Sequence, residues 1–95
     1  MKLVFSPLAL RQLHEVQAYI AYDNPSAAAK VVARIRQSIE TLADFPKLGQ
    51  VWNDGPTRAL PVSGLPYRVH YRVIEAAETV EIMLVMHTSR KPPRL

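Results

Sequence analysis

Hydrophobic residues in the first half of the chain recur every three or four positions, a spacing that places them on one face of a helix. Two such stripes follow one another: Ala9, Leu13, Val16 and Ile20, then Ala28, Val32, Ile35, Ile39 and Leu42. Each stripe is preceded by an N-cap residue and a proline, at Ser6-Pro7 and at Asn24-Pro25. Because the turn between the stripes is short, the pattern predicts an antiparallel helical hairpin that ends at Phe45-Pro46.

The second half of the chain loses this spacing and is typical of short strands separated by turns. Segment 47–57, which contains glycine, asparagine and proline, predicts a loop. Strands are predicted at the start of the chain and at three later places, namely 2–6, 58–62, 67–74 and 80–86. The last of these is almost continuously apolar, as is typical of a strand at the centre of a sheet.

These elements follow one another in the order β-α-α-β-β-β, which is typical of the α+β class. We expect the three late strands to form an antiparallel meander, because short turns join them. The helical hairpin is then predicted to pack on one face of this twisted antiparallel sheet. A chain of 95 residues has room for one hydrophobic core, so residues 1–95 are predicted to form a single domain.

The composition argues against several classes of site. The chain has no cysteine and therefore no disulfide or thiolate metal site, and its 3 histidines show no metal-ligand spacing. No glycine-rich phosphate loop, nucleophile triad or paired-carboxylate site can be recognised. No apolar run approaches the ~20 residues that a membrane span needs, and no signal-peptide core is visible. We therefore expect a cytoplasmic protein without membrane contact, metal or cofactor.

The charge of the chain is unevenly distributed. The formal net charge is +4, and no acidic residue follows Glu81, whereas Arg90, Lys91 and Arg94 lie near the C-terminus. A basic balance favours an anionic partner, which can be a nucleic acid, an acidic protein segment or a ribosomal surface. An ordinary solvated surface is the alternative interpretation of the same charge.

Alternation along segment 67–74 assigns its side chains to two faces of the sheet. The aromatic and branched side chains suit the face that packs on the helices. The face opposite the helices is assigned Arg68, His70 and Arg72 and, from the next strand, Met83 and Val85. We expect an uncovered face that is half basic and half apolar to bind a partner protein. The alternative is that the C-terminal tail folds over it.

Ribonuclease chemistry is a second use for these side chains. One group would deprotonate a 2′-hydroxyl, another would protonate the leaving oxygen, and arginine would stabilise the negative charge. The residues able to contribute are Arg58, Arg68, His70, Tyr71, Arg72, His87 and Arg90. Arginines on strands more often form surface ion pairs, and a single strand histidine is usually structural. The residues by themselves therefore indicate this activity weakly.

Several segments resemble motifs of the RelE/ParE superfamily of toxins. They are Tyr19–Ala28, Leu42–Gly49, Arg58–Val62, Pro66–Val73 and Val85–Pro93. The match runs through nearly the whole chain, in order and with spacing similar to that of the family. The resemblance implies a type II toxin with a helical hairpin on a twisted antiparallel sheet. It also implies a cognate antitoxin, usually encoded beside the toxin, whose disordered acidic or amphipathic segment wraps around it in a hetero-oligomer.

Two mechanisms occur on the fold that the resemblance implies. RelE-like members cleave messenger RNA on the ribosome with strand lysines and arginines and a late tyrosine, whereas ParE-like members poison DNA gyrase. Arg68 matches the arginine of the RelE strand, and Arg58 lies near the place of a lysine. Thr88 stands where a further RelE arginine belongs, and no tyrosine follows Tyr71. His87 can still serve as a proton donor or acceptor near neutral pH.

These departures favour a ParE-like toxin that acts by binding and is not an enzyme. The residues expected to contact its target, DNA gyrase, are Arg58, Arg68, Arg72, His87, Arg90 and Arg94. The surface expected to contact the antitoxin comprises Arg68, His70, Arg72, Met83 and Val85. A ribosome-dependent mRNA endonuclease is the alternative function and would use Arg58, Arg68, His87 and Arg90. A module that binds its antitoxin without being toxic is the third interpretation.

Overall fold

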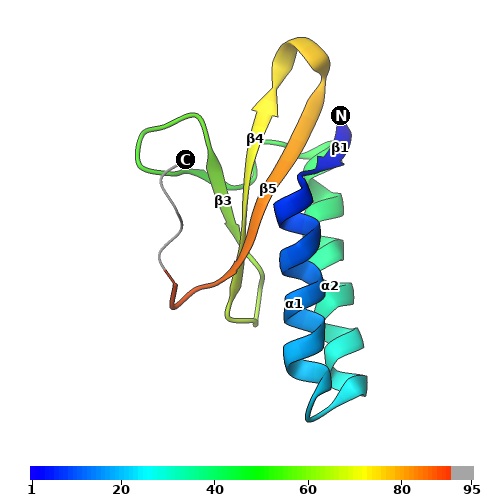
Figure 1. Cartoon of the computed structure of the whole chain (residues 1–95). Coiled ribbons are helices and arrows are strands. Elements are labelled where there is room, and N and C mark those ends of the chain that lie inside the picture. The colour runs from blue at the N-terminus through cyan, green and yellow to red at the C-terminus, as the bar shows by residue number, and fades with distance from the viewer. Residues whose placement is uncertain (91–95) are drawn as a thin grey trace.

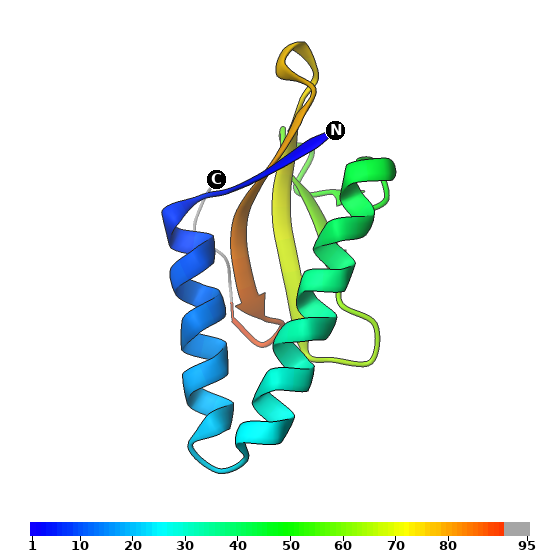
Figure 2. The same cartoon turned by 90° about the vertical axis from the view of Figure 1, so that its right-hand side faces the viewer.

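A helical hairpin covers one face of a five-stranded sheet in the computed structural model, which describes residues 1–90 (Figures 1 and 2). The hairpin consists of α1 (Pro7–Ala21) and α2 (Pro25–Asp44). The strands are β1 (Lys2–Phe5), β2 (Gln50–Val51), β3 (Arg58–Pro61), β4 (Tyr67–Ile74) and β5 (Thr79–His87). A short 3-10 helix, η1 (Glu75–Ala77), joins β4 to β5. The predicted fold class is confirmed, and β2 is a short strand within the segment that the sequence predicts to be a loop.

Both helices begin where the sequence predicts, because each N-cap side chain bonds a backbone N–H of the first turn. The Ser6 hydroxyl accepts a hydrogen bond from the Ala9 N–H (3.0 Å) at the start of α1. Asn24 Oδ1 accepts one from the Ala27 N–H (3.0 Å) at the start of α2. Among residues 1–90, neither helix combines the length and the hydropathy that a membrane span requires.

The sheet has the strand order β1-β5-β4-β3-β2, so that β5 lies in its interior as predicted. β2 to β5 form antiparallel pairs, and β1 is added parallel to β5, with Phe5 opposite Ile82. The expected all-antiparallel sheet is therefore mixed at one edge. β1 reaches its neighbour through the helices and the meander instead of a tight turn, so the connection does not impose an antiparallel direction.

The hydrophobic core lies between the helical hairpin and the sheet. α1 contributes Ala9 and Leu13, and α2 contributes Ile35, Ile39 and Leu42, all of them buried. The sheet side is supplied by residues of β4 and β5, namely Tyr67, Val69, Tyr71, Val80, Ile82 and Val85. The helical stripes of the sequence therefore meet the apolar face of the strands, as predicted.

A β-bulge in β5 changes which of its residues face the helices. Tyr71 is opposite Ile82 whereas His70 is opposite Leu84, so Met83 is an extra residue between the two pairs. Beyond this bulge Val85 packs in the core and is 2% exposed, while Leu84 shares the side of His70. The prediction that Val85 lies on the face opposite the helices is therefore wrong, because strict alternation cannot anticipate the added residue.

Candidate functional site

The loop before β3 covers part of the sheet face opposite the helices. The ring of Trp52 meets the ring of His70 edge-on, with 4.9 Å between their centroids. The Arg68 guanidinium carbon lies 5.0 Å from the centroid of the same indole, a cation–π contact. His70 is completely buried. The prediction that this face is uncovered is therefore wrong at His70, and the alternative cover, a C-terminal tail, involves residues 91–95, outside the described part.

Arg68 fastens the segment after β5 to this face. Its Nε donates to His70 Nε2 (2.9 Å), and its Nη2 donates to the Arg90 carbonyl (2.8 Å). A longer contact of 3.5 Å joins Nη1 to the Thr88 carbonyl. Every nitrogen of the guanidinium is therefore engaged, and one of its faces lies against Trp52. Arg68 has a structural task here, although the family resemblance aligns it with a functional arginine.

His70 is held as a neutral imidazole. Burial, reinforced by the positive charge of Arg68, lowers the pKa of His70 from 6.5 to about 4. Because Nε2 accepts a hydrogen bond from Arg68, the neutral ring carries its proton on Nδ1. That buried nitrogen has no hydrogen-bond partner among residues 1–90. Such a group suits a structural position and cannot supply a proton near neutral pH.

Arg72 and Arg58 are also engaged, at separate places. Arg72 Nε lies 2.6 Å from Glu81 Oε1 in a cross-strand ion pair. Arg58 is opposite Tyr71 in the β3–β4 ladder, on the side of the sheet that faces the helices. Its Nη1 donates to the Gly49 carbonyl (2.7 Å). Arg58 therefore lies on the face opposite to the one that carries the side chains of Arg68 and Arg72.

A groove of about 680 Å³ lies between α1 and the last residues of β5. Its walls are formed by Gln12, Val16 and Tyr19 from α1 and by Tyr67, Val85 and His87 from the strands. Arg90 lines it beyond the end of β5. Tyr19 is 80% exposed, so its ring offers apolar surface that the fold itself does not use. A concave surface with apolar walls and several polar groups is typical of a binding site.

The half-buried ring of His87 lines this groove. Its ring meets Tyr67 edge-on at 5.5 Å between centroids. The Ser89 N–H donates to His87 Nδ1 (3.1 Å), and the Ser89 hydroxyl lies 2.7 Å from the same nitrogen. These contacts place the proton of the neutral ring on Nε2, where it can be donated to a ligand. Burial raises the pKa of Tyr67, while Tyr19 raises it further and Arg90 lowers it.

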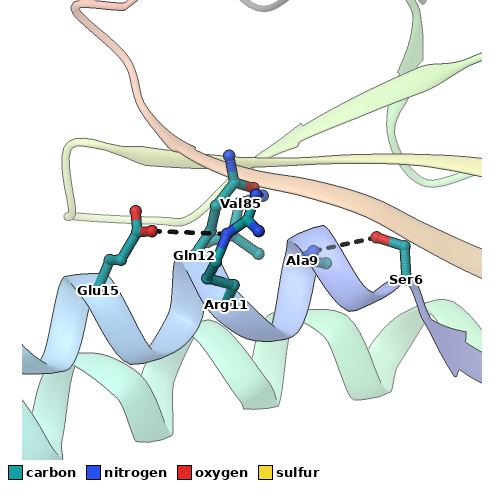
Figure 3. A network of polar contacts seen from close by, with 6 residues as sticks. All are labelled: Ser6, Ala9, Arg11, Gln12, Glu15 and Val85. Atoms are coloured by element: carbon teal, nitrogen blue, oxygen red, sulfur yellow. Dashed lines mark hydrogen bonds and ion pairs between the residues drawn. The ribbon is translucent and has the colours of Figure 1, made fainter.

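The N-cap residue Ser6 and Gln12 of α1 bond the backbone of β5 around its bulge; Figure 3 draws Ser6, Gln12 and Val85. The Ser6 hydroxyl donates to the Met83 carbonyl (2.9 Å). Further along the strand, Gln12 Oε1 accepts the Val85 N–H (2.8 Å). Figure 3 also shows the ion pair of Arg11 with Glu15 (3.8 Å) beside Gln12 on the same helix. The first turns of α1 are thereby fixed relative to β5, and one wall of the groove with them.

The predicted site residues therefore fall into separate groups. Arg68, His70 and Arg72 lie opposite the helices, Arg58 lies on the helix side near Gly49, and His87 and Arg90 share the groove. Met83 is the extra residue of the bulge, and Arg94 lies outside the described residues. Of the four residues that a ribonuclease would use, Arg58 lies apart from the other three, while Arg68 reaches the groove residue Arg90 through its backbone carbonyl (2.8 Å).

Three residues of these surfaces were not anticipated from the sequence. They are Trp52, Gln12 and Tyr19. A single tryptophan in a polar loop was a visible signal, because so large an apolar side chain seldom lacks a packing partner. Gln12 and Tyr19 lie off the apolar stripe of α1, and the family-like segment that begins at Tyr19 did not by itself indicate a groove. Within residues 1–90, no three His, Asp or Glu side chains are grouped so as to hold a metal ion.

The fold is shared with solved toxin structures. The ParE–ParD system of P. aeruginosa aligns with a TM-score of 0.79 at 20% identity, covering 92% of this chain and 95% of that one. The intact E. coli RelBE toxin–antitoxin complex aligns with a TM-score of 0.69 at 16% identity, covering 94% and 98%. The hairpin-on-sheet architecture is thus that of the RelE/ParE toxins.

Sequence comparison assigns the family. The profile of the ParE toxin of the type II toxin–antitoxin system parDE matches residues 3–92. Y4kP of Sinorhizobium fredii, a protein named as an inferred toxin, is 41% identical over 87 residues, which cover 92% of this chain and 88% of that protein. The chain therefore belongs to the ParE toxin family of type II toxin–antitoxin systems.

Proposed function

We propose that this toxin inhibits DNA gyrase by binding it and that a cognate antitoxin neutralises it in the cytoplasm. The observation that carries the proposal is that the candidate catalytic arginines of the strands, Arg58 and Arg68, are both tied to backbone carbonyls. Arg58 and Arg68 are bonded to backbone carbonyls on opposite faces of the sheet. His87 lies in the groove on the helix side. A phosphoryl-transfer site needs its acid, base and charge-stabilising groups within reach of one bond, so this arrangement supports a toxin that binds.

An antitoxin partner is supported by the solved structures that share this fold. The solved structures with this fold include toxin–antitoxin complexes from E. coli and Mycobacterium tuberculosis. Another aligned structure holds E. coli RelE together with a peptide of its antitoxin. By analogy, we infer that this chain is neutralised by direct contact with a segment of its own antitoxin.

A ribosome-dependent mRNA endonuclease is the second candidate, and one observation favours it. His87, Tyr67 and Arg90 line the same groove, and the His87 ring is oriented with Nε2 as its proton donor. An imidazole and a guanidinium in one concave site can act on a phosphodiester. The reaction would then lie in the groove and would not use Arg58 or Arg68, contrary to the set expected from the sequence.

The test is a supercoiling assay with purified toxin, gyrase, ATP and relaxed plasmid. We expect dose-dependent loss of supercoiling together with linear, protein-linked DNA, and full recovery when the antitoxin is added. Arg90→Ala should weaken inhibition, whereas Arg36→Ala serves as the matched control, because that arginine is exposed on α2 and does not line the groove. Unaltered gyrase activity combined with His87-dependent cleavage of ribosome-bound message would replace this proposal with the endonuclease.

The C-terminal end offers a second test of the binding proposal. Removal of residues 90–95 should abolish toxicity and leave a folded protein, because the buried core of the described chain ends at Val85. Growth after induction measures toxicity, and circular dichroism measures folding. A truncated chain that unfolds, or one that remains fully toxic, would contradict the assignment of a target-binding role to this end.

A further inference from the structure

The pairing of β5 with β4 ends just before the segment that carries Arg90. Tyr67 and His87 are the last residues opposite each other in this ladder, and the Thr88 N–H donates to the Pro66 carbonyl (2.9 Å) just beyond it. From this point to residue 90 the chain has no neighbouring strand among the described residues. Its course up to Arg90 is therefore set by side chains and by local turns.

Arg68 bonds this segment from the sheet. Its Nη2 donates to the Arg90 carbonyl (2.8 Å), and its Nη1 makes the longer contact of 3.5 Å with the Thr88 carbonyl. The two acceptors lie on either side of Ser89, so one guanidinium spans the segment. A guanidinium is planar and presents its donors in a fixed fork. Arg68 therefore restrains the orientation of this backbone as well as its distance from the sheet.

Two aromatic side chains restrain the guanidinium itself. Arg68 Nε donates to His70 Nε2 (2.9 Å), and its guanidinium carbon lies 5.0 Å from the centroid of the Trp52 indole. His70 is completely buried and lies opposite Ala59 and Leu84 in the neighbouring strands, so its ring is anchored in the interior of the sheet. A long side chain that is already held in one rotamer loses little further entropy when it bonds the segment after β5.

Arg90 is engaged from both sides of the sheet. Its carbonyl is bonded by Arg68, whose side chain lies on the face opposite the helices. The same residue lines the groove on the helix side together with His87, and its N–H closes a local turn to the His87 carbonyl (3.1 Å). Because the backbone at Arg90 is fixed from one face, the region that its guanidinium can reach on the other face is restricted.

We infer that Arg68 is a positioning residue for the inhibition of gyrase and that Trp52 and His70 act through it. These three side chains form a latch that holds the backbone from Thr88 to Arg90, so that the Arg90 side chain is presented to the target. The inference rests on the proposed function. It gives Arg68 a role without contact to the target, in place of the direct contact that the sequence predicts.

Inhibition of gyrase by the Arg68→Lys toxin tests the latch. Lysine keeps the positive charge but lacks the fork that bonds two carbonyls and the His70 nitrogen at once. We expect the toxin concentration that halves supercoiling to rise by roughly tenfold, because a binding group that is loosely held contributes less. Arg36→Lys, the same exchange at an exposed position of α2, is the matched control and should leave this concentration unchanged. An Arg68→Lys toxin as potent as the unaltered chain would overturn the inference.

Two variants of His70 separate positioning from direct contact with the target. His70→Phe keeps a ring but removes the acceptor of the Arg68 Nε–H, and we expect potency to fall by roughly threefold to fivefold. His70→Gln places a carbonyl oxygen near the position of Nε2 and should restore most of the potency. Because His70 is 0% exposed, it cannot touch a partner. Unchanged potency of His70→Phe would mean that Arg68 acts by direct contact, and equal losses in the two variants would overturn the part assigned to His70.

Backbone dynamics report on the latch without gyrase. In the Arg68→Lys protein, the amide order parameters of Ser89 and Arg90 should fall toward the ~0.6 that marks flexible backbone, while those of β4 and β5 should stay near ~0.85. A residue that only stabilises the fold would not loosen this segment selectively. Order parameters that match those of the unaltered chain would overturn the latch. Circular dichroism of each variant shows that a loss of potency does not reflect unfolding.

The outcomes separate this inference from the proposed function. If the unaltered toxin does not inhibit gyrase, the proposed function fails and the role given to the latch fails with it. If the unaltered toxin inhibits gyrase and Arg90→Ala weakens inhibition, the proposed function stands. Should the Arg68 and His70 variants then remain fully potent, the latch is wrong although the function is right.

Discussion

Gly49 is held so closely by its surroundings that even one added methyl group should destabilise the fold. Its N–H donates to the Tyr71 hydroxyl (2.8 Å), and its carbonyl accepts from Arg58 (2.7 Å). A Cβ at this position would lie 2.8 Å from both Cε1 and the hydroxyl oxygen of Tyr71, and 2.9 Å from the Ala59 carbonyl. Tyr71 is completely buried and Ala59 belongs to β3, so neither can move away easily.

The magnitude follows from two costs in Gly49→Ala. Forcing a methyl group into a packed site costs about 1–3 kcal/mol. Loss of the hydrogen bond to the Tyr71 hydroxyl adds about 1 kcal/mol. The expected loss of about 2–4 kcal/mol is a large share of the roughly 5–15 kcal/mol that stabilises a small domain. It corresponds to a fall in Tm of roughly 10–25 °C for a chain of this length.

Thermal and urea unfolding, followed by circular dichroism, measure this loss. Gly55→Ala is the matched control, because its Cβ would lie 3.4 Å from the nearest atom, the Trp52 carbonyl oxygen, and should change stability by less than about 0.5 kcal/mol. In a Tyr71→Phe background the hydroxyl contact is gone, so Gly49→Ala should cost less there. A Gly49→Ala protein that melts within a few degrees of the unaltered chain would refute the reasoning.

Three further predictions concern the face opposite the helices. The pKa of His70 is lowered from 6.5 to about 4, so the unfolded chain binds a proton at this side chain more readily than the folded chain does. The free energy of unfolding should therefore decline as the pH falls from about 6.5 to about 4. The loss should be roughly 2–3 kcal/mol in urea titrations, and His70→Gln should remove this dependence. Trp52→Ala should lower the free energy of unfolding by about 1–3 kcal/mol in the same titrations. Trp52→Phe keeps an aromatic ring over His70 and should lower it less. Equal losses for the two variants would contradict the importance of the ring contacts. Arg72→Ala should cost less than about 1 kcal/mol, because its ion pair with Glu81 is partly exposed, and a larger loss would mean that the pair is more than a surface contact.

Local sequence signals were sufficient for both helices and for four of the five strands, β2 (Gln50–Val51) being the exception. The helices begin at Pro7 and Pro25 because the preceding Ser6 and Asn24 bond the first turns, an interaction within four residues. The interior position of β5 was predicted from its apolar composition, since a nearly continuous apolar strand is typical of the inside of a sheet. Family motifs along the chain added the toxin class, which the sequence comparisons confirm.

The candidate site was predicted less well, because its residues meet across long sequence separations. Arg68 and His70 were correctly assigned to one face of β4, but their cover by Trp52 depends on how the loop before β3 folds back. The assignment of Val85 to that face failed, because one extra residue at Met83 reverses the alternation that follows it. No periodic pattern can show in advance where such a residue will be inserted.

The sequence by itself determined the helical hairpin, the three late strands and the family of this protein. These features depend on the spacing of apolar residues and on capping side chains close to the helices that they begin. Only the tertiary structure decided that Arg68 is bonded to the segment after β5, that Gln12 closes the edge of β5, and that His87 and Arg90 line one groove. Those relations depend on where β1 ends and where β5 bulges, and packing across the whole chain decides both.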